Sequence, residues 1–353
     1  MPNYNGHLNS NEIFSSICNM IISQQVFADN IENSFSELVD MGRVDGSLYG
    51  DTKLYYDTDI LESHPWGGDA EAANLLDVDR PKDPDCQAIT LDKFRQIRLT
   101  VDNYLSKRAW STESAFASFN SVMLGWIRDT KRIYDATLYN TFIGTHETSA
   151  GKQTQTITVS TTAPAQDIAE GMANLLVDIA TPGRDYNDYG NYRSFGSNNL
   201  VAVWNAKYVN KIKKVDMPTI FHKEGLVEKL GEHVLPAKYF GTVNTTSGTT
   251  AADNKTVYAL VEKTYGSGST AVHCFPGDLL PDSTAYLANE TYTVDDNIMF
   301  KLFYKGSVPY MSAFEVATSF YNPRALLENH YLTFCHNTLQ SLKGKPFITV
   351  RKA

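Results

Sequence analysis

The sequence predicts an α+β fold assembled from unusually extended parts. Three observations predict it: a long segment with a two-residue hydrophobic period, one helical stripe of exceptional length, and a C-terminal region with many short β segments. The chain has 353 residues, of which 42% are hydrophobic and 20% charged, so it can form a substantial core. At roughly 100–200 residues per domain, we expect two intertwined lobes or one elaborate domain.

The first 40 residues form a polar arm that contains one amphipathic stretch. Its apolar residues recur at three- and four-residue spacing, which is the helical signature. They are Ile13, Phe14, Ile17, Met20, Ile21, Phe27, Ile31 and Phe35. Such an arm can pack on its own domain or on a neighbouring one.

Two strands joined by a turn-rich segment come next. Val44–Leu61 and Ala88–Leu105 are rich in β-forming residues, and in the second the apolar residues from Ile97 to Val101 alternate with polar ones. The acidic segment His64–Asp85 between them contains several Pro and Gly residues. We therefore predict a long β-hairpin that extends from the main body. A projecting hairpin has little core of its own, so we expect it to lie on another subunit.

A single long helix is predicted over Thr112–Ile143. Ser111 is a suitable N-cap, and Gly144 stands where a helix usually ends. At about 1.5 Å per residue, the helix would be roughly 48 Å long. We place Lys131 and Arg132 on the far side of its apolar stripe. The stripe consists of Phe116, Phe119, Met123, Trp126, Ile127, Tyr134, Leu138 and Phe142.

The rest of the chain alternates between helices and strands. A second helix is predicted with Thr162 as its N-cap and its end at Thr181–Gly183. Thr242–Asn254 is predicted to be a loop, and Ala206–Val215 a short helix. Strands are predicted at Thr154–Ser160, Leu200–Trp204, Thr256–Glu262, Ile298–Tyr304, Phe314–Phe320, Leu326–Phe334 and Phe347–Val350.

Charge and cysteine content exclude several classes of protein. The net charge is −9, and the densest basic stretch (Lys211, Lys213 and Lys214) is predicted to be a solvated helix face, so we expect no sequence-specific binding of nucleic acid. An acidic protein can still enclose DNA that is held by confinement. Four widely spaced cysteines indicate reduced thiols. Because no apolar run approaches the roughly 18 residues that cross a bilayer, and the N-terminus is polar, we expect a soluble, unexported protein that binds no membrane.

No group of residues in the sequence predicts catalysis or a cofactor. His273–Cys274 and Cys335–His336 place a thiol beside an imidazole, but neighbours on a strand point to opposite faces. A metal site from His330 with the second pair matches no standard spacing. We therefore predict no catalytic, cofactor-binding or metal-binding residues, and no enzyme.

Two weaker possibilities remain open. The acidic pairs Asp57/Asp59 and Asp77/Asp79 are calcium ligands by type, although solvated hairpin acids are the simpler interpretation. The Tyr-rich loop Tyr186–Tyr192 leaves a soluble enzyme or carbohydrate-active protein as an alternative.

The order of these parts resembles the phage capsid proteins of the Hong Kong ninety-seven fold. Arg132–Gly144 looks like the end of that family's spine helix, and Leu200–Asn205 with the following helix looks like its apical strand and helix. Asp296–Phe303 and Tyr321–Tyr331 are similar to the C-terminal region of small short-tailed phages of the phi-twenty-nine kind.

The resemblance implies a domain organisation. It consists of an N-terminal arm (1–43), an E-loop hairpin (44–105), a peripheral (P) domain with the spine helix (106–160), an apical (A) domain (161–295), and C-terminal strands that return to the P-domain (296–353). Some relatives join their subunits by a Lys–Asn isopeptide bond, but the residues for that bond cannot be matched in this chain.

The resemblance also implies a function. It is that of a major capsid protein, whose copies form pentamers and hexamers of an icosahedral head shell around double-stranded DNA. Scaffolding and portal proteins would be its partners, assembly would take place in the bacterial cytoplasm, and the product would be the virion. The nearest alternative is an encapsulin, which is a bacterial compartment shell of the same fold.

Overall fold

The structure is a computed structural model, and it describes residues 36–46, 52–64, 78, 80–102, 113–212, 231–249, 257–281 and 285–353. Several sequence-based expectations fall outside these residues. They are the amphipathic stretch of the arm, the middle of the acidic turn segment, the N-cap Ser111, and the pair Lys213 and Lys214.

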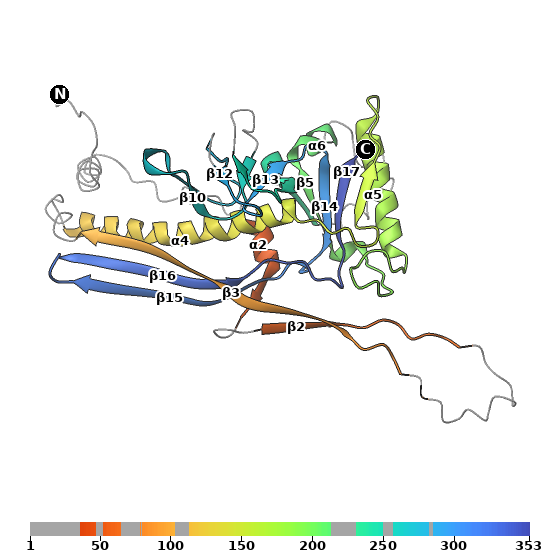
Figure 1. Cartoon of the computed structure of the whole chain (residues 1–353), viewed down its shortest axis with the longest axis horizontal. Coiled ribbons are helices and arrows are strands. Elements are labelled where there is room, and N and C mark those ends of the chain that lie inside the picture. Colours follow the sequence, from red (N-terminus) through yellow and green to blue (C-terminus); the bar gives the residue numbers. More distant parts are fainter. Residues whose placement is uncertain are drawn as a thin grey trace.

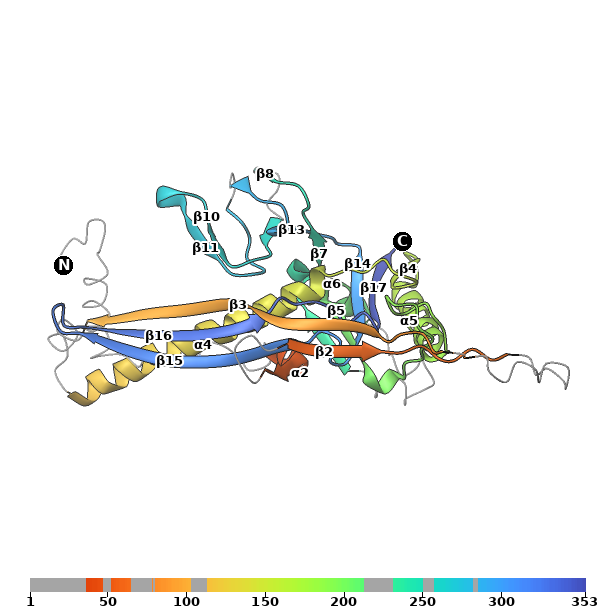
Figure 2. The same cartoon turned by 60° about the horizontal axis from the view of Figure 1, so that its bottom comes forward.

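The molecule is elongated and has three recognisable parts (Figure 1). At one end the long helix α4 (Glu113–Thr145) runs beside three long strands, β3 (Asp85–Asp102), β15 (Tyr310–Asn322) and β16 (Leu327–Asn337). At the other end a mixed sheet is packed against helices, and near it a thin two-stranded arm projects away from the body (Figures 1 and 2). The predicted α+β class is confirmed, and the extended shape follows from the long helix and the long strands.

Helix α4 spans Glu113–Thr145, which confirms the predicted long helix. Gly144 does not end it, because the helix continues to Thr145. The glycine is required for a different reason: a Cβ atom at position 144 would lie 2.1 Å from the backbone oxygen of Tyr239. Tyr239 belongs to the short 3-10 helix η4 (Ala237–Tyr239), so the glycine allows a close contact between the two helices.

Three antiparallel strands form a ribbon along α4. They are β15 (Tyr310–Asn322), β16 (Leu327–Asn337) and the C-terminal two thirds of β3 (Asp85–Asp102). Alternate side chains of the ribbon face the helix, where the rings of Phe334 and His336 lie 5.7 and 5.5 Å from that of Tyr134. The predicted strands in these regions are confirmed, each with somewhat longer bounds.

Lys131, which we placed on the side of the helix opposite its apolar stripe, is not exposed to solvent there. Its side chain is buried, and its Nζ atom lies 3.0 Å from the carboxylate of Asp135. The ribbon covers this side of α4, which the helical period alone does not reveal. Asp135 also accepts a hydrogen bond of 2.6 Å from the hydroxyl of Tyr310 and contacts Arg43. The buried carboxylate is therefore satisfied from three elements at once.

The mixed sheet has the strand order β4-β17-β14-β5-β6. Its strands are β4 (Thr154–Ile157), β17 (Phe347–Lys352), β14 (Ile298–Tyr304), β5 (Leu200–Asn205) and β6 (Gly231–Leu235). Every residue of β5 is buried, as predicted for a buried strand. The final segment of the chain thus serves two structures: β14 and β17 pair in this sheet, whereas β15 and β16 pair in the ribbon.

Each face of the mixed sheet packs against helices. Helices α5 (Pro164–Ala180) and α6 (Ala206–Ile212) cover one face, where Ile168 and Tyr208 pack with Trp204 of β5. The end of α4 and the short helix α2 (Glu37–Gly42) cover the other face. This second core joins the long helix to the sheet.

A buried lysine adds a polar connection between α4 and the sheet. The Nζ atom of Lys301 on β14 donates to the backbone oxygen of His146 at 3.0 Å and to the hydroxyl of Thr349 at 2.9 Å. Glu147, just after the helix, lies 3.4 Å away and also pairs with Arg351. Burial lowers the pKa of Lys301 to about 8.

Helix α5 begins one residue later than predicted, and Thr162 is not its N-cap. The N-cap is Ala163, which has no side-chain acceptor. The hydroxyl of Ser160 instead accepts a hydrogen bond from the Ala163 backbone N–H, and the carboxylate of Asp167 accepts one from the Ser160 N–H. These two hydrogen bonds take the place of the predicted threonine cap.

Residues 241–294 contribute small sheets beside α4. They contain β7 (Gly241–Val243), β8 (Gly248–Thr249), β9 (Val257–Ala259), β10 (Lys263–Tyr265), β11 (Val272–Cys274), β12 (Ala285–Tyr286) and β13 (Thr291–Val294). The predicted loop at Thr242–Asn254 is confirmed at residues 244–247 but wrong on either side of them, because β7 and β8 pair with β13 and β12. An ion pair of 3.0 Å between Arg95 and Glu262 links this region to the ribbon. Among the described helices, none combines the length and the hydrophobicity that crossing a membrane requires.

The close contact at Gly144 predicts a position-specific effect on stability. Gly144→Ala should lower the free energy of unfolding by about 1–3 kcal/mol, because the added methyl group overlaps the Tyr239 backbone. Gly125→Ala is the matched control: it lies in the same helix with no atom within 4 Å of the added Cβ, and it should raise stability by about 0.5–1 kcal/mol. Denaturant unfolding of both variants measures this, and equal effects would contradict the proposed contact.

Candidate assembly interface

The described part of the hairpin arm comprises residues 52–64, 78 and 80–90. Strand β2 (Thr52–Asp57) pairs antiparallel with only the first six residues of β3, Asp85–Thr90. From Leu91 onward β3 pairs with β16 in the ribbon. The predicted hairpin is therefore confirmed, but neither predicted strand belongs to it as a whole, because Val44 and Asp45 of the first pair with β15 and residues from Leu91 onward of the second pair with β16. The structure shows instead one continuous strand that belongs to the arm at one end and to the ribbon at the other.

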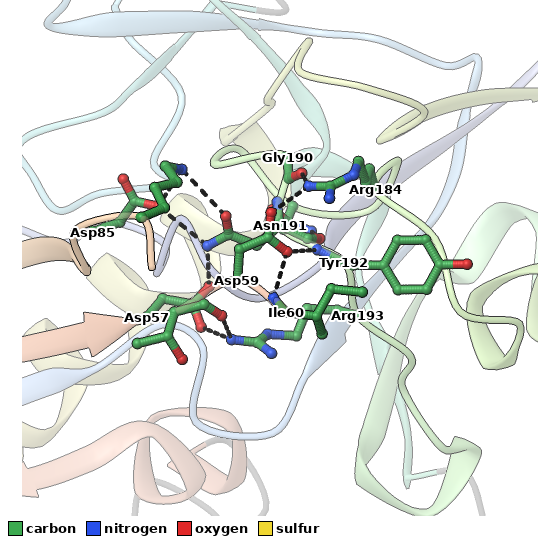
Figure 3. Close-up of polar contacts among 12 residues, drawn as sticks. Asp57, Asp59, Ile60, Asp85, Arg184, Gly190, Asn191, Tyr192 and Arg193 are labelled. Carbon is green, nitrogen blue, oxygen red and sulfur yellow. Dashed lines mark hydrogen bonds and ion pairs between the residues drawn. The ribbon is translucent and has the colours of Figure 1, made fainter. Parts of the chain in front are cut away.

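Two aspartates of the arm contact the loop that follows helix α5 (Figure 3). The carboxylate of Asp59 accepts hydrogen bonds from Arg184 at 2.5 Å and from the Tyr192 backbone N–H at 2.9 Å. The carboxylate of Asp57 accepts one from Arg193 at 2.5 Å, and Arg193 also donates to the backbone oxygen of Thr58. Charge-assisted contacts of this kind are stronger than neutral ones and set a defined geometry.

Asn191 connects both strands of the arm to the same loop. Its side-chain nitrogen donates to Asp57 at 3.1 Å and to Asp85 at 3.2 Å (Figure 3). Asn191 is itself fixed, because the side chain of Asn187 accepts from its backbone N–H and donates to its backbone oxygen. We call the set of Asp57, Asp59 and Asp85 with Arg184, Asn191 and Arg193 the latch.

The latch shifts the pKa of its acidic members. Hydrogen bonding from the Tyr192 backbone, followed by that from Arg184, holds the pKa of Asp59 well below its usual range. Hydrogen bonds from Lys82 and Asn191 likewise lower the pKa of Asp85. Both carboxylates are therefore held in their charged form at neutral pH.

A second set of contacts joins the base of the arm to the segment between β16 and β17. The side chain of Gln87 donates to the backbone oxygen of Ser341 at 3.0 Å and accepts from the N–H of Lys343 at 2.9 Å. Beneath it, Ile89 and Leu91 are buried with Met311, Cys335 and Leu342. The base of the arm is thus part of the body, and only the portion beyond it is free.

The free portion of the arm carries exposed apolar side chains. Ile60 is 54% exposed, Leu61 74%, and Val78 73%, while Tyr56 near the base is 65% exposed. Aliphatic residues gathered on a projecting element, and not covered by their own chain, mark an interaction surface.

The candidate chemical sites of the sequence do not assemble. The imidazole of His273 bonds to Glu262, while the thiol of Cys274 is buried in an apolar cluster. The thiol of Cys335 donates to the backbone oxygen of Ala313, and His336 bonds to Tyr134 and to the Asn337 backbone. Within the residues that the structure describes, no three metal-ligating side chains come together.

The acidic pairs have different outcomes. Asp57 and Asp59 are engaged by arginines of the latch, so they are not solvated hairpin acids as predicted. Asp77 and Asp79 lie outside the described residues. In the Tyr-rich loop, the hydroxyl of Tyr186 donates to Asp178 at 3.0 Å, and its neighbours Arg184, Asn191 and Arg193 supply the latch. The sequence shows both parts of this site, an acidic hairpin and a distant loop with two arginines. It does not show that the two parts are in contact.

Comparison with known proteins gives a consistent result. A family model described as "Phi29-like phage major capsid protein" matches residues 5–342. A search of curated proteins found no match.

Solved structures of phage particles share the fold. A chain of the Staphylococcus phage Andhra capsid is similar with a TM-score of 0.57 at 11% identity, covering 94% of this chain and 87% of that one. A chain in a structure of native bacteriophage P68 gives a TM-score of 0.61 at 10% identity, covering 92% and 87%. One from the mature capsid of bacteriophage PhiM1 gives 0.51 at 9% identity, covering 94% and 90%.

The lowered pKa of Asp59 predicts how the latch responds to acid. A carboxylate whose folded pKa is depressed stabilises the folded state above its ordinary pKa of about 4, and this contribution is lost as the pH falls further. Hydrogen exchange over residues 57–62, corrected for the intrinsic rate, should therefore accelerate between pH 5 and pH 3, assuming that folding is otherwise retained.

Substitutions at neutral pH distinguish loss of the latch contacts from a general effect of acid on the fold. Asp59→Asn should accelerate the same exchange several-fold already at pH 7, because the charge that pairs with Arg184 is removed. The matched control is Glu62→Gln, which removes an exposed charge from the same arm and should leave the exchange unchanged. Unaltered protection in Asp59→Asn would show that the latch does not hold the arm.

Proposed function

We propose, from the premise that this chain belongs to the family of Phi29-like phage major capsid proteins, that its arm and its body act on different subunits of the head shell. The protein is a phage major capsid protein, and the alternative of a bacterial compartment shell is not favoured because the matching family is a phage family. We propose that its copies form pentamers and hexamers that close into an icosahedral shell around double-stranded DNA.

The observation that carries this proposal is the contrast within the hairpin arm. Its base is fixed by the latch and by the contacts of Gln87, whereas Ile60, Leu61 and Val78 beyond it are exposed. A subunit that worked alone would gain nothing from holding apolar side chains in water. The arm is the E-loop of the shell, and its exposed residues lie on the adjacent subunit, where burial of apolar area stabilises the contact.

The other parts have corresponding roles. The ribbon and α4 form the P-domain, in which a 33-residue helix lies along three long strands. Residues 161–295 supply most of the A-domain, which meets its copies around five-fold and six-fold axes. The same surface closes both kinds of ring, so these interfaces are heterologous and related by rotation. Many individually weak contacts per subunit then give a stable shell.

The charge of the chain agrees with a container for DNA. A net charge of −9 does not favour pairing with phosphates, so DNA is held by confinement inside the shell and not by sequence-specific contacts. The protein performs no catalysis in this role. Scaffolding and portal proteins are the proposed partners during assembly in the bacterial cytoplasm, and the virion is the final location.

Shortening the arm tests this function directly. Replacing residues 60–81 with a short Gly-Ser linker removes Ile60, Leu61 and Val78 but keeps Asp57, Asp59 and Asp85 of the latch. The subunit should fold, as shown by an unchanged unfolding transition, and closed shells should be absent from electron micrographs. The experiment is done with co-expressed scaffolding protein, alongside the full-length chain and Glu62→Gln. Shells of normal size from the shortened chain would show that the arm does not join subunits.

A further inference from the structure

The outer edge of strand β15 is open over most of its length. Strand β1 (Arg43–Asp45) pairs with it in parallel, but only at Tyr310–Ser312. Over Val316–Asn322, β15 pairs with β16 on one side, and no other described strand lies against it (Figure 1). A strand edge in this state presents a row of backbone N–H and C=O groups that can pair with another strand.

The side chains of this segment are also uncovered. Every residue from Glu315 to Tyr321 is exposed, including Val316 at 37%, Phe320 at 63% and Tyr321 at 47%. The sequence from Val316 to Pro323 contains no charged residue, and it is rich in β-branched, aromatic and small side chains. An exposed, uncharged edge of this composition promotes uncontrolled aggregation unless something covers it.

The opposite edge of the same ribbon is built differently. Beyond Thr90, β3 has no described strand on its outer side, but this stretch carries Asp92, Lys93, Arg95 and Arg98. Charged side chains are the usual protection of a permanently free edge. A β-bulge between Ala313 and Val316 could protect β15 in a similar way, but it precedes the open segment. The ribbon therefore has one guarded edge and one that is left available for pairing.

We propose that Val316–Phe320 pairs antiparallel with the same segment of a second copy of this chain, across a two-fold axis at Thr318. Two three-stranded ribbons then become one continuous six-stranded sheet. This inference rests on the proposed function only in that a shell supplies many copies at close range.

The sequence of the segment favours a pairing with itself in this register. With Thr318 opposite Thr318, Val316 of each copy faces Phe320 of the other, and all three residues stand on one face of the strand. Thr–Thr pairs and pairs of aromatic with β-branched residues are favourable across antiparallel strands. No like charges come opposite one another, because Glu315 faces Tyr321. A two-fold contact also covers the open edge of both copies at once, which a contact with any other strand does not do.

Single cysteines test both the partner and the register. In a background with Cys18→Ser and Cys86→Ser, Thr318→Cys should give disulfide-linked dimers in most subunits of oxidised shells, since position 318 faces itself. Val316→Cys alone and Phe320→Cys alone should stay monomeric, whereas shells assembled from a mixture of these two variants should contain dimers. Thr100→Cys, exposed on the guarded strand, is the matched control and should stay monomeric.

Hydrogen exchange provides an independent measurement on the unsubstituted chain. The amides of Val316–Phe320 that do not bond to β16 should exchange at least tenfold more slowly in shells than in unassembled subunits. Intact shells with unchanged exchange would overturn the proposal, as would intact shells of Thr318→Cys without dimers. Protection without the Thr318 cross-link would mean that a different strand covers the edge. Absence of shells from the unsubstituted chain would count against the proposed function and is distinguished by electron microscopy.

Discussion

The structure depends on one strand that belongs to two layers. The first third of β3 pairs with β2 in the arm, and the remainder pairs with β16 in the ribbon. The pairing with β16 begins at Leu91, directly after the pairing with β2 ends at Thr90, and Ile89 and Leu91 are buried in one cluster, so the base of the arm is joined to the ribbon. The packing of the ribbon on α4 extends this constraint to the helix, and the second core continues it to the mixed sheet. The projecting arm is thereby connected, through the ribbon and α4, to the mixed sheet.

Polar groups stabilise the joints between these layers, and apolar cores stabilise each layer. Asp135 joins α4 to β15 and to Arg43, Lys301 joins the end of α4 to β14 and β17, and the latch joins the arm to the loop after α5. Buried ionic groups are costly to desolvate and add little net stability compared with apolar packing. Their directional hydrogen bonds define the angles between parts, which matters for a subunit that must match its copies. The partly exposed ion pairs of the latch are individually weak and act as a network.

The exposed surface of the subunit differs in polarity from one region to another. The guarded edge of β3 carries charges, whereas the open edge of β15 and the end of the arm carry apolar or uncharged side chains. A monomeric protein with these exposed features would tend to aggregate. In a capsid protein, the same features direct association toward a closed and finite assembly if, as proposed, each exposed region meets a surface on another copy.

The sequence alone determined the elements with a clear period: the long helix, the buried strand at Leu200–Trp204, the strands of the C-terminal region and the existence of a hairpin. These depend on local patterns of three to four or two residues, which a chain carries wherever it is placed. Only the tertiary structure decided that Lys131 is buried, that Gly144 serves a close contact, and that Asp57 and Asp59 are held by arginines more than 120 positions away in the chain. The physical reason is that burial, close approach and ion pairing depend on which surfaces meet, and the sequence pattern of one element contains no information about the element that covers it.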